Sequence, residues 1–257
     1  LAKYRAGERR SGWLSGLSRE EGAHRPTLGG LRIGKPLPER EESEPFDSQL
    51  EWERDGQYFH YLTRWAHALL EASKLDQKYR GWARELMQTA SSRFLYRTPT
   101  GYKMYWKMSI DLSRPLVPSM GHHGPLDGLV TSLCVGGVEV QPYRSIVEGQ
   151  DLVSTDPLGI GGLLSAAARL KTLEGERELY RRALDSALVG LRHYRWDLGP
   201  QAEARGRLGF RELGLAIGVR GCDEPKLEPF RENADELVRF WSRPGNQAVR
   251  SWQAHLD

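Results

Sequence analysis

The chain has 257 residues, of which 39% are hydrophobic, 9% aromatic and 28% charged. This composition lies outside the range of disordered chains and indicates a globular protein with one large core or two ordinary ones. The 37 basic and 34 acidic residues are interspersed, and a net charge of +3 excludes the clustered basic surface typical of a nucleic-acid partner.

No apolar run approaches the roughly 18 residues that cross a bilayer, and no signal core follows the basic start LAKYRAGERR. We therefore expect no membrane partner. Cys134 and Cys222 are isolated, without a CxxC pair or a disulfide framework, which favours a cytoplasmic location. The first residue is Leu rather than Met, which indicates a processed, truncated or partly observed chain.

The N-terminal part of the chain lacks a helical or strand pattern. Residues 1–48 contain Gly-rich, Pro-rich and acidic pieces, with no sustained period of 3.6 or 2. We expect an irregular N-terminal arm with short extended pieces there. Over residues 49–257 helical patterns dominate, and we expect one domain of helical hairpins.

The first hairpin is predicted from two long amphipathic patterns. A helix is expected over residues 48–73, and after a break at 74–77 a second one extends to Phe94. Two long helices with a short connection predict an antiparallel hairpin. The first stripe recurs at steps of three and four residues and consists of Tyr58, Tyr61, Leu62, Trp65, Leu69 and Ala72.

Two further pairs follow, and in each the leading helix is short and rich in Gly, Ala and Leu. The partner helix carries Arg and Glu opposite an apolar face, which predicts an inner and an outer layer. The segment KMYWKMSIDL alternates like a short strand, and a brief helix is expected after it. The predicted later helices cover residues 125–137, 161–171, 176–194, 208–219 and 227–241, with the start of another hairpin at 246–256.

The hairpin succession, the aromatic helix DGQYFHYLTRWAHALLEAS, the segment MYWKMSIDLSRP and the helix RLGFRELGLAIG resemble the six-hairpin, (α/α)6-toroid superfamily of glycosidases and sugar epimerases. The resemblance covers about residues 49–257 and is architectural. It implies an all-α fold of helical hairpins arranged as a complete or partial toroid, and a carbohydrate-active enzyme. Fewer than six complete pairs are visible, so either the toroid is incomplete in this chain or some hairpins are irregular.

One turn or two before Tyr58, the positions that continue the apolar stripe of the first helix hold charged residues. In one interpretation this turn projects beyond the core, with Glu51 and Asp55 near the helix N-terminus and Arg54 paired with an outside carboxylate. In the other, Glu51, Asp55 and Tyr58 line a polar pocket beside Trp52, with Arg54 as a further sugar ligand. Sugar hydroxyls bind carboxylates and guanidinium groups, and sugar faces stack on aromatic rings.

Asp55 and Asp127 are the predicted acid/base pair of an inverting glycosidase, whose carboxyl groups stand roughly 6.5–9.5 Å apart. In the segment SMGHHGPLDG, His122 and His123 point in opposite directions if the loop is extended, so we expect no metal site. Either histidine can act as a general acid or base. The alternative is a sharp turn in which Asp127 caps a helix that begins at Gly128.

Several other residues complete the predicted sugar site or are excluded from it. His60 and His67 lie two turns apart, too far to chelate one ion, and we expect surface or hydrogen-bonded roles for them. The HExxH, phosphate-loop, dinucleotide and nucleophile-elbow patterns are missing, so no metal or organic cofactor is expected. Further predicted sugar ligands are Tyr105, Lys107, Arg114 and Arg211, the last with a structural bridge to Glu212 as its alternative.

We therefore expect a glycoside hydrolase or a sugar epimerase whose partner is a small sugar or glycan. The alternative is a non-catalytic helical scaffold that binds a protein or a glycan. An enzyme requires Glu51, Asp55, Asp127 and one of the paired histidines to converge on one cleft, whereas a scaffold can leave them scattered.

Overall fold

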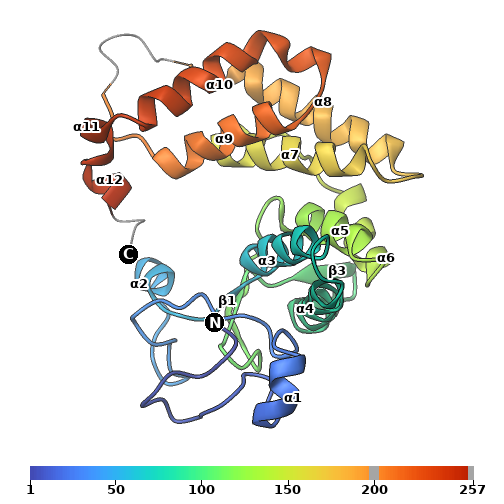
Figure 1. Ribbon diagram of the computed structural model, residues 1–257, viewed down its shortest axis with the longest axis vertical. Helices are drawn as coiled ribbons and strands as arrows, with labels where there is room; N and C mark the ends of the chain where they lie inside the picture. Colours follow the sequence, from blue (N-terminus) through green and yellow to red (C-terminus); the bar gives the residue numbers. More distant parts are fainter. Residues whose placement is uncertain (197–202, 254–257) are drawn as a thin grey trace. The chain divides into compact units, whose positions relative to one another are not determined.

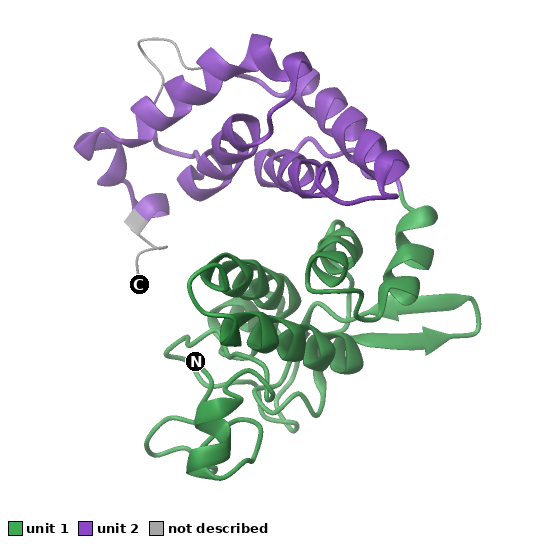
Figure 2. Ribbon diagram, turned by 45° about the vertical axis from the view of Figure 1, so that its right-hand side comes forward, with its two compact units in different colours: residues 1–150 green, residues 151–257 purple. Residues whose placement is uncertain are grey.

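The computed structural model describes residues 1–196 and 203–253 and is predominantly helical (Figure 1). The chain divides into two compact units, Leu1–Gln150 and Asp151–Asp257 (Figure 2). The expected N-terminal arm belongs to the first unit, so the boundary between units follows residue 150 rather than residue 48. In the described part of the chain, no helix has the length and apolar character needed to cross a membrane.

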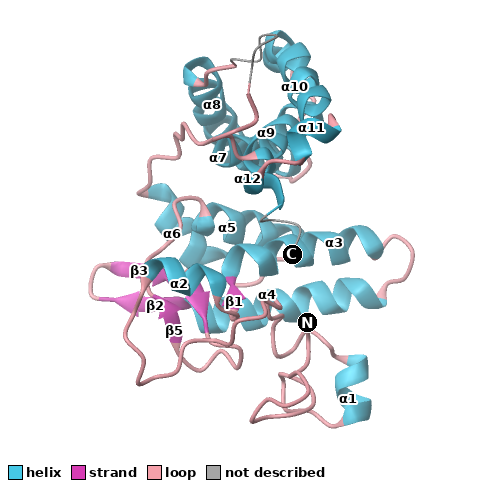
Figure 3. Ribbon diagram, turned by 90° about the vertical axis from the view of Figure 1, so that its left-hand side faces the viewer, coloured by secondary structure: helices cyan, strands magenta, loops and turns pink. Residues whose placement is uncertain are grey.

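The first unit consists of the arm, two pairs of helices and two small sheets (Figure 3). Helix α3 packs against α4, α5 packs against α6, and α3 also contacts α5. The antiparallel sheets have the strand orders β1-β4-β5 and β2-β3. The helices are α1 (Arg19–His24), α2 (Ser48–Glu53), α3 (Phe59–Ala72), α4 (Lys78–Phe94), α5 (Gly124–Cys134) and α6 (Val140–Glu148), and the strands are β1 (Gln57–Tyr58), β2 (Leu95–Thr98), β3 (Gly101–Met104), β4 (Lys107–Met108) and β5 (Pro115–Val117).

The second unit repeats the same arrangement with two more pairs of helices. Helix α7 packs against α8, α9 packs against α10, and the two leading helices α7 and α9 pack against each other. The elements are α7 (Pro157–Leu170), α8 (Arg177–His193), α9 (Gly209–Gly221), the 3-10 helix η1 (Pro225–Leu227), α10 (Glu228–Trp241), α11 (Pro244–Gln247) and α12 (Arg250–Gln253).

The arm is irregular, as expected, but it is packed onto the first unit. Its helix α1 begins with a capping box, in which the Ser18 hydroxyl accepts the N–H of Glu21 at 3.2 Å and the Glu21 carboxylate accepts the N–H of Ser18 at 3.2 Å. The buried Thr27 donates its hydroxyl to the carbonyl of Trp82 on α4 at 2.8 Å. These contacts explain why the arm is not a separate domain.

The prediction of one helix over residues 48–73 is wrong, because the chain leaves the helical path between α2 and α3. Gly56 has φ +150, and a Cβ there would lie 2.7 Å from Cε of Lys107 and 2.9 Å from the carbonyl oxygen of Met108. Strand β1 pairs with β4 at this point. A backbone approach this close tolerates only glycine, so contact with a distant strand overrides the local helical pattern.

The apolar faces of the later helices agree with the sequence pattern. On α4 and α8, the side chains placed on the core side by their spacing are buried, apart from two partly exposed aromatics at the start of α4. This agreement follows from the long, regular period of both helices. The buried residues of α8 are Leu179, Ala183, Leu184, Ala187, Leu188, Gly190 and Leu191.

The core face of α3 differs from the predicted stripe by about one residue. The buried side chains are Phe59, Leu62, Thr63 and Ala66. Tyr61 and Trp65, expected in the core, are 44% and 43% exposed. The break before α3 changes the phase of the helix and turns two aromatic rings outward.

Three other boundaries depart from the expectations. Helix α5 begins at Gly124, so Asp127 lies within its first turn and does not cap a helix at Gly128. Helix α6 was not predicted; it begins after Glu139, which has a left-handed backbone conformation with φ 48. Within the expected final hairpin at 246–256, α11 and α12 are short, and residues 254–256 lie outside the described residues.

Glycines allow the leading helices of the second unit to pack at backbone distance. A Cβ on Gly161 of α7 would lie 2.1 Å from the carbonyl oxygen of Gly214 on α9, and one on Gly218 would lie 2.6 Å from Cα of Gly161. Both distances are shorter than any real Cβ contact, so these helices meet through their main chains.

We expect Gly161→Ala to lower the free energy of unfolding by about 1–3 kcal/mol, because the added methyl group forces α7 and α9 apart. Gly162→Ala is the matched control, since no atom lies within 4 Å of its Cβ. This control should raise stability by up to about 1 kcal/mol through helix propensity. Urea unfolding followed by circular dichroism measures both, and equal stability of the two variants would contradict the packing.

Candidate functional site

Asp55, one of the predicted catalytic carboxylates, is fully buried in an ionic network. Its Oδ2 accepts a hydrogen bond from Nε of Arg32 at 2.8 Å, and its Oδ1 accepts the N–H of Gly34 at 2.9 Å. Arg32 in turn forms two hydrogen bonds to the Glu8 carboxylate, at 2.6 and 2.7 Å. Asp55 thus joins the arm to the β1 region and has no oxygen left for a substrate.

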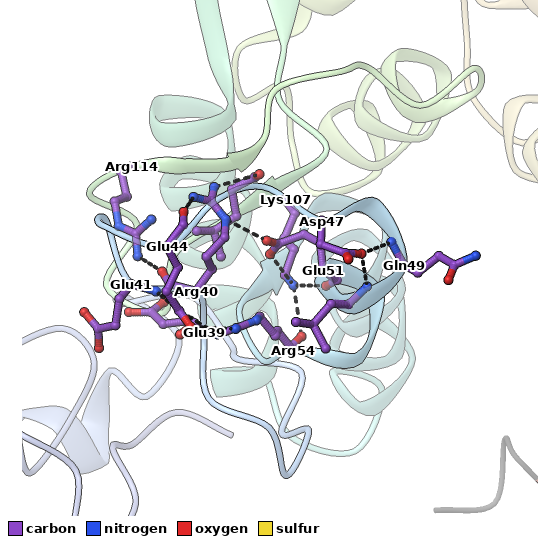
Figure 4. A network of polar contacts seen from close by, with 12 residues as sticks. Glu39, Arg40, Glu41, Glu44, Asp47, Gln49, Glu51, Arg54, Lys107 and Arg114 are labelled. Carbon is purple, nitrogen blue, oxygen red and sulfur yellow. Dashed lines mark hydrogen bonds and ion pairs between the residues drawn. The ribbon is translucent and has the colours of Figure 1, made fainter.

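Glu51 and Lys107, two predicted sugar ligands, form a second buried network (Figure 4). Nζ of Lys107 donates to Oε1 of Glu51 at 3.0 Å and to the carbonyl oxygens of Glu51 and Arg54 at 2.6 and 2.9 Å. Oε2 of Glu51 accepts a hydrogen bond from Nε of Arg40 at 2.9 Å. The ammonium group therefore satisfies carbonyls that the end of α2 leaves without helical partners.

Burial lowers the pKa of Lys107, and the hydrogen bond and charge of Glu51 oppose this effect. Two other predicted ligands are held nearby (Figure 4). Both amino groups of Arg54 donate to the Glu44 carboxylate at 2.9 Å, and Arg114 donates to the carbonyl of Arg40. Arg54 thus pairs with a carboxylate outside its helix, and all four side chains serve the protein's own contacts.

A cluster of rings, which we call the aromatic cluster, consists of Trp52, Tyr58, His60, Tyr61 and Trp106. The rings of Trp52 and Tyr58 are stacked, with centroids 5.5 Å apart and an interplanar angle of 2°. Trp106 meets Trp52 edge-on at 5.3 Å, and His60 lies 4.6 Å from Tyr61. Trp52 is 41% exposed, so part of the cluster is open to solvent.

The hydroxyl of Tyr58 is an unusual feature of this cluster. Tyr58 is only 3% exposed, and its hydroxyl oxygen has no hydrogen-bond partner among the described residues. Burial, followed by the charge of Glu51, raises the pKa of Tyr58, so the phenol stays protonated and can donate. A buried hydroxyl without a partner costs free energy, so this phenol is a local strain on the fold.

Asp127 lies beside this cluster and is paired with an arginine of α3. Both of its carboxylate oxygens accept hydrogen bonds from Nη2 of Arg64 at 3.3 Å. Burial lowers the pKa of His60 to about 4, while the negative charge of Asp127 opposes the shift and Arg64 supports it. The imidazole is therefore neutral near physiological pH, and its unprotonated nitrogen can accept a hydrogen bond.

The remaining predicted residues divide between this region and other parts of the chain. His123 is the N-cap residue of α5, and its ring lies 4.5 Å from that of His122. Gly121 lies against Trp106, where a Cβ would be 3.6 Å from the indole, so this loop reaches the aromatic cluster. Tyr105 instead stacks on Tyr96 at 4.3 Å.

Arg211 belongs to the second unit and pairs with Asp156, the N-cap residue of α7. The expected bridge between Arg211 and Glu212 is absent among the described contacts of these two residues, since Glu212 bonds to Arg207 and Trp241. Arg211 thus contributes to the N-terminus of α7 within its own unit.

Three members of this site are not among the residues that the sequence predicts for it. His60 is expected in a surface or hydrogen-bonded role, Trp106 in a short strand, and Arg64 has no predicted role. The one available signal was the density of aromatic and histidine residues in GQYFHY. Its meaning depends on the break before α3, which no local pattern indicates.

Within residues 1–196 and 203–253, no group of three or more His, Cys, Asp or Glu side chains is placed to hold a metal ion. Comparisons of the chain with protein-family models, with curated proteins and with solved structures gave no match. The aromatic cluster and Asp127 are therefore the features that indicate a function.

We expect Lys107→Met to destabilise the protein by about 3–5 kcal/mol, because it leaves Glu51 buried without its cation. The matched control is Lys103→Met, which removes the same charge from an exposed position on β3. The control should change stability by less than about 0.5 kcal/mol. Chemical unfolding measures both, and a small effect of Lys107→Met would show that the buried pair is dispensable.

The neutral state of His60 predicts a pH dependence of stability. Its pKa is about 4 in the fold and about 6.5 in the unfolded chain, so between these values the unfolded state binds more protons. Stability should fall as the pH falls through this window, by up to about 3 kcal/mol. His60→Asn should remove this loss, while substitution of the exposed His122 should preserve it; parallel pH profiles for wild type and His60→Asn would refute the assignment.

Proposed function

We propose that this chain is part of a helical-hairpin toroid that acts on a sugar or glycoside by acid/base chemistry. The packing of the helices supports the architecture. In each unit the leading helices contact each other, α3 with α5 and α7 with α9, and each trailing helix packs on its own leading helix. Such layering is what a toroid of hairpins, complete or partial, requires of its inner and outer helices.

The observation that carries the functional proposal is the aromatic cluster next to Asp127. Carbohydrates present weakly polar faces of C–H groups, which pack on exposed rings such as Trp52. Their hydroxyls need charged acceptors and donors at the edge of those rings. Asp127 provides the acceptor and Arg64 the donor.

The acid/base step is assigned to groups around the same rings. The proposed proton acceptor is the Asp127 carboxylate, and the imidazole of His60, which stays neutral, holds a sugar hydroxyl by a hydrogen bond. His122 and His123 are alternative proton carriers, because their loop packs on Trp106 through Gly121. Asp55 is left out of the proposed machinery, since its oxygens are occupied by Arg32 and backbone N–H groups.

A second candidate function is glycan binding without catalysis. The exposure of Trp52 and Tyr61, 41% and 44%, favours it, because aromatic rings that remain partly open to solvent in the free protein are typical of glycan-binding platforms. Turnover distinguishes the two functions. We also propose a reducing compartment such as the cytoplasm, since Cys134 and Cys222 form no disulfide in the described part of the chain.

The test is a screen of monosaccharides, aryl glycosides and oligosaccharides for binding and for turnover. We expect Trp52→Ala to weaken binding about tenfold, the loss of one stacking contact. Asp127→Asn should reduce turnover by about 10²–10⁴-fold with the fold intact. Binding without turnover in the wild-type protein would favour the glycan-binding function.

Trp65→Ala is the matched control for Trp52→Ala. Trp65 has a similar exposure, 43%, and makes no ring contact with the aromatic cluster among the described residues. Its substitution should leave sugar affinity unchanged. Equal losses in both variants, or no binding of any sugar to the wild-type protein, would refute the proposed function.

A further inference from the structure

A separate cavity of about 390 Å³ lies in the first unit, between the start of the arm and two other segments. Its walls come from residues 4–10, 38–41 and 110–111. None of the rings of the aromatic cluster lines it, so it is independent of the proposed sugar site. Its volume lies within the range of small-molecule sites, near the lower end.

Two of the carboxylates in its walls are already neutralised. Glu8 receives two hydrogen bonds from Arg32, at 2.6 and 2.7 Å. Asp111 pairs with Arg10 at 2.6 Å and accepts the hydroxyls of Ser109 and Ser113 at 2.7 and 2.6 Å. These contacts make rigid walls whose charges are compensated within the protein.

The charge of Asp111 is almost completely compensated by its hydrogen bonds. Burial raises the pKa of Asp111, but the hydrogen bonds from Ser113, Ser109 and Arg10 outweigh it and lower the pKa to about 2. Its carboxylate therefore stays ionised and fully bonded. It is therefore not available to a ligand as an acceptor.

Glu39 is different, because this residue lines the cavity and its carboxylate has no ion pair among the described residues. Its Oε2 accepts the backbone N–H of Ile110 at 2.5 Å. Burial raises the pKa of Glu39, and the charges of Asp111 and Glu41 act in the same direction. Arg114 opposes them but donates its hydrogen bond to the carbonyl of Arg40.

The carboxylate of Glu39 thus has no cation in contact with it. A positively charged ligand at this point offsets the free-energy cost of burying the carboxylate. The rest of the wall provides groups for hydroxyls, namely the exposed Arg9 and Glu41 and the hydroxyl of Tyr4. We propose that this cavity binds a small protonated amine that carries hydroxyl groups, such as an amino sugar or an amino alcohol, with its ammonium group on Glu39.

The test compares glucosamine with glucose, which has the same ring and a hydroxyl in place of the ammonium. Isothermal titration calorimetry and saturation-transfer NMR measure the binding of each at a pH where the amine is protonated. We expect glucosamine to bind at least about tenfold more tightly than glucose. The affinity should fall as the pH is lowered through the pKa of Glu39, because a proton then competes with the ammonium.

Glu39→Gln should weaken glucosamine binding about tenfold or more. The amide oxygen of the glutamine can still accept the N–H of Ile110. Because the substitution also removes a buried charge, we expect the variant to fold. Glu42→Gln is the matched control, since it makes the same charge change at an exposed neighbour that does not line the cavity. It should leave the affinity unchanged.

Four other outcomes would contradict the proposal. Equal affinity for glucose would refute the recognition of an amine, and equal losses in the Glu39 and Glu42 variants would refute the contact with Glu39. A loss in Trp52→Ala with none in Glu39→Gln would place the amine at the aromatic cluster. Failure of glucosamine to bind the wild-type protein would also refute it, whatever the outcome of the screen of neutral sugars.

Discussion

The organisation of the first unit depends on one buried ion pair, between Lys107 of β4 and Glu51 of α2. An ammonium group without exposed surface is tolerated only if strong acceptors surround it, and here a carboxylate and two carbonyl oxygens do so. The same contacts end α2 and connect it to the strand that pairs with β1. The break in the helical path, and the positions of Trp52 and Tyr58 on its two sides, therefore follow from this pair.

The charged residues of this region divide into two groups that residue type alone does not distinguish. Glu51, Arg54, Asp55 and Lys107 satisfy each other, the arm and the main chain, and so they stabilise the fold. Glu51, Asp55 and Lys107 are buried and Arg54 is nearly so, and a buried charge needs its partners at all times. The groups with capacity for a ligand lie elsewhere, at the aromatic cluster and in the cavity beside Glu39.

The two proposed sites use opposite physical features. The aromatic cluster offers partly exposed rings, with polar groups at its edge, and suits a neutral molecule that has both apolar and hydroxyl-bearing surfaces. The cavity at Glu39 is a concave space with uncompensated negative charge, and it suits a small cation. Both lie in the unit that contains the arm, and the arm itself provides much of the wall of the cavity.

The second unit shows how much of a fold a regular helical pattern predicts. Its helices keep the order and the apolar faces that their spacing predicts, and small residues set the distance between α7 and α9. In the sequence, a leading helix rich in small residues indicates that close contacts of this kind can form. Which glycines touch, and through which atoms, follows only from the packed pair.

The sequence by itself determined the helical class, the extents of α4, α8, α9 and α10, and the core residues of α8, because these depend on short-range periodicity. Only the tertiary structure decided the break at Gly56, the outward rotation of Tyr61 and Trp65, and the burial of Asp55. Each of these depends on contacts with residues distant in the chain, Lys107 and Met108 for the break and Arg32 for Asp55. A periodic pattern carries no information about such partners, so only the tertiary structure decides which residues form a site.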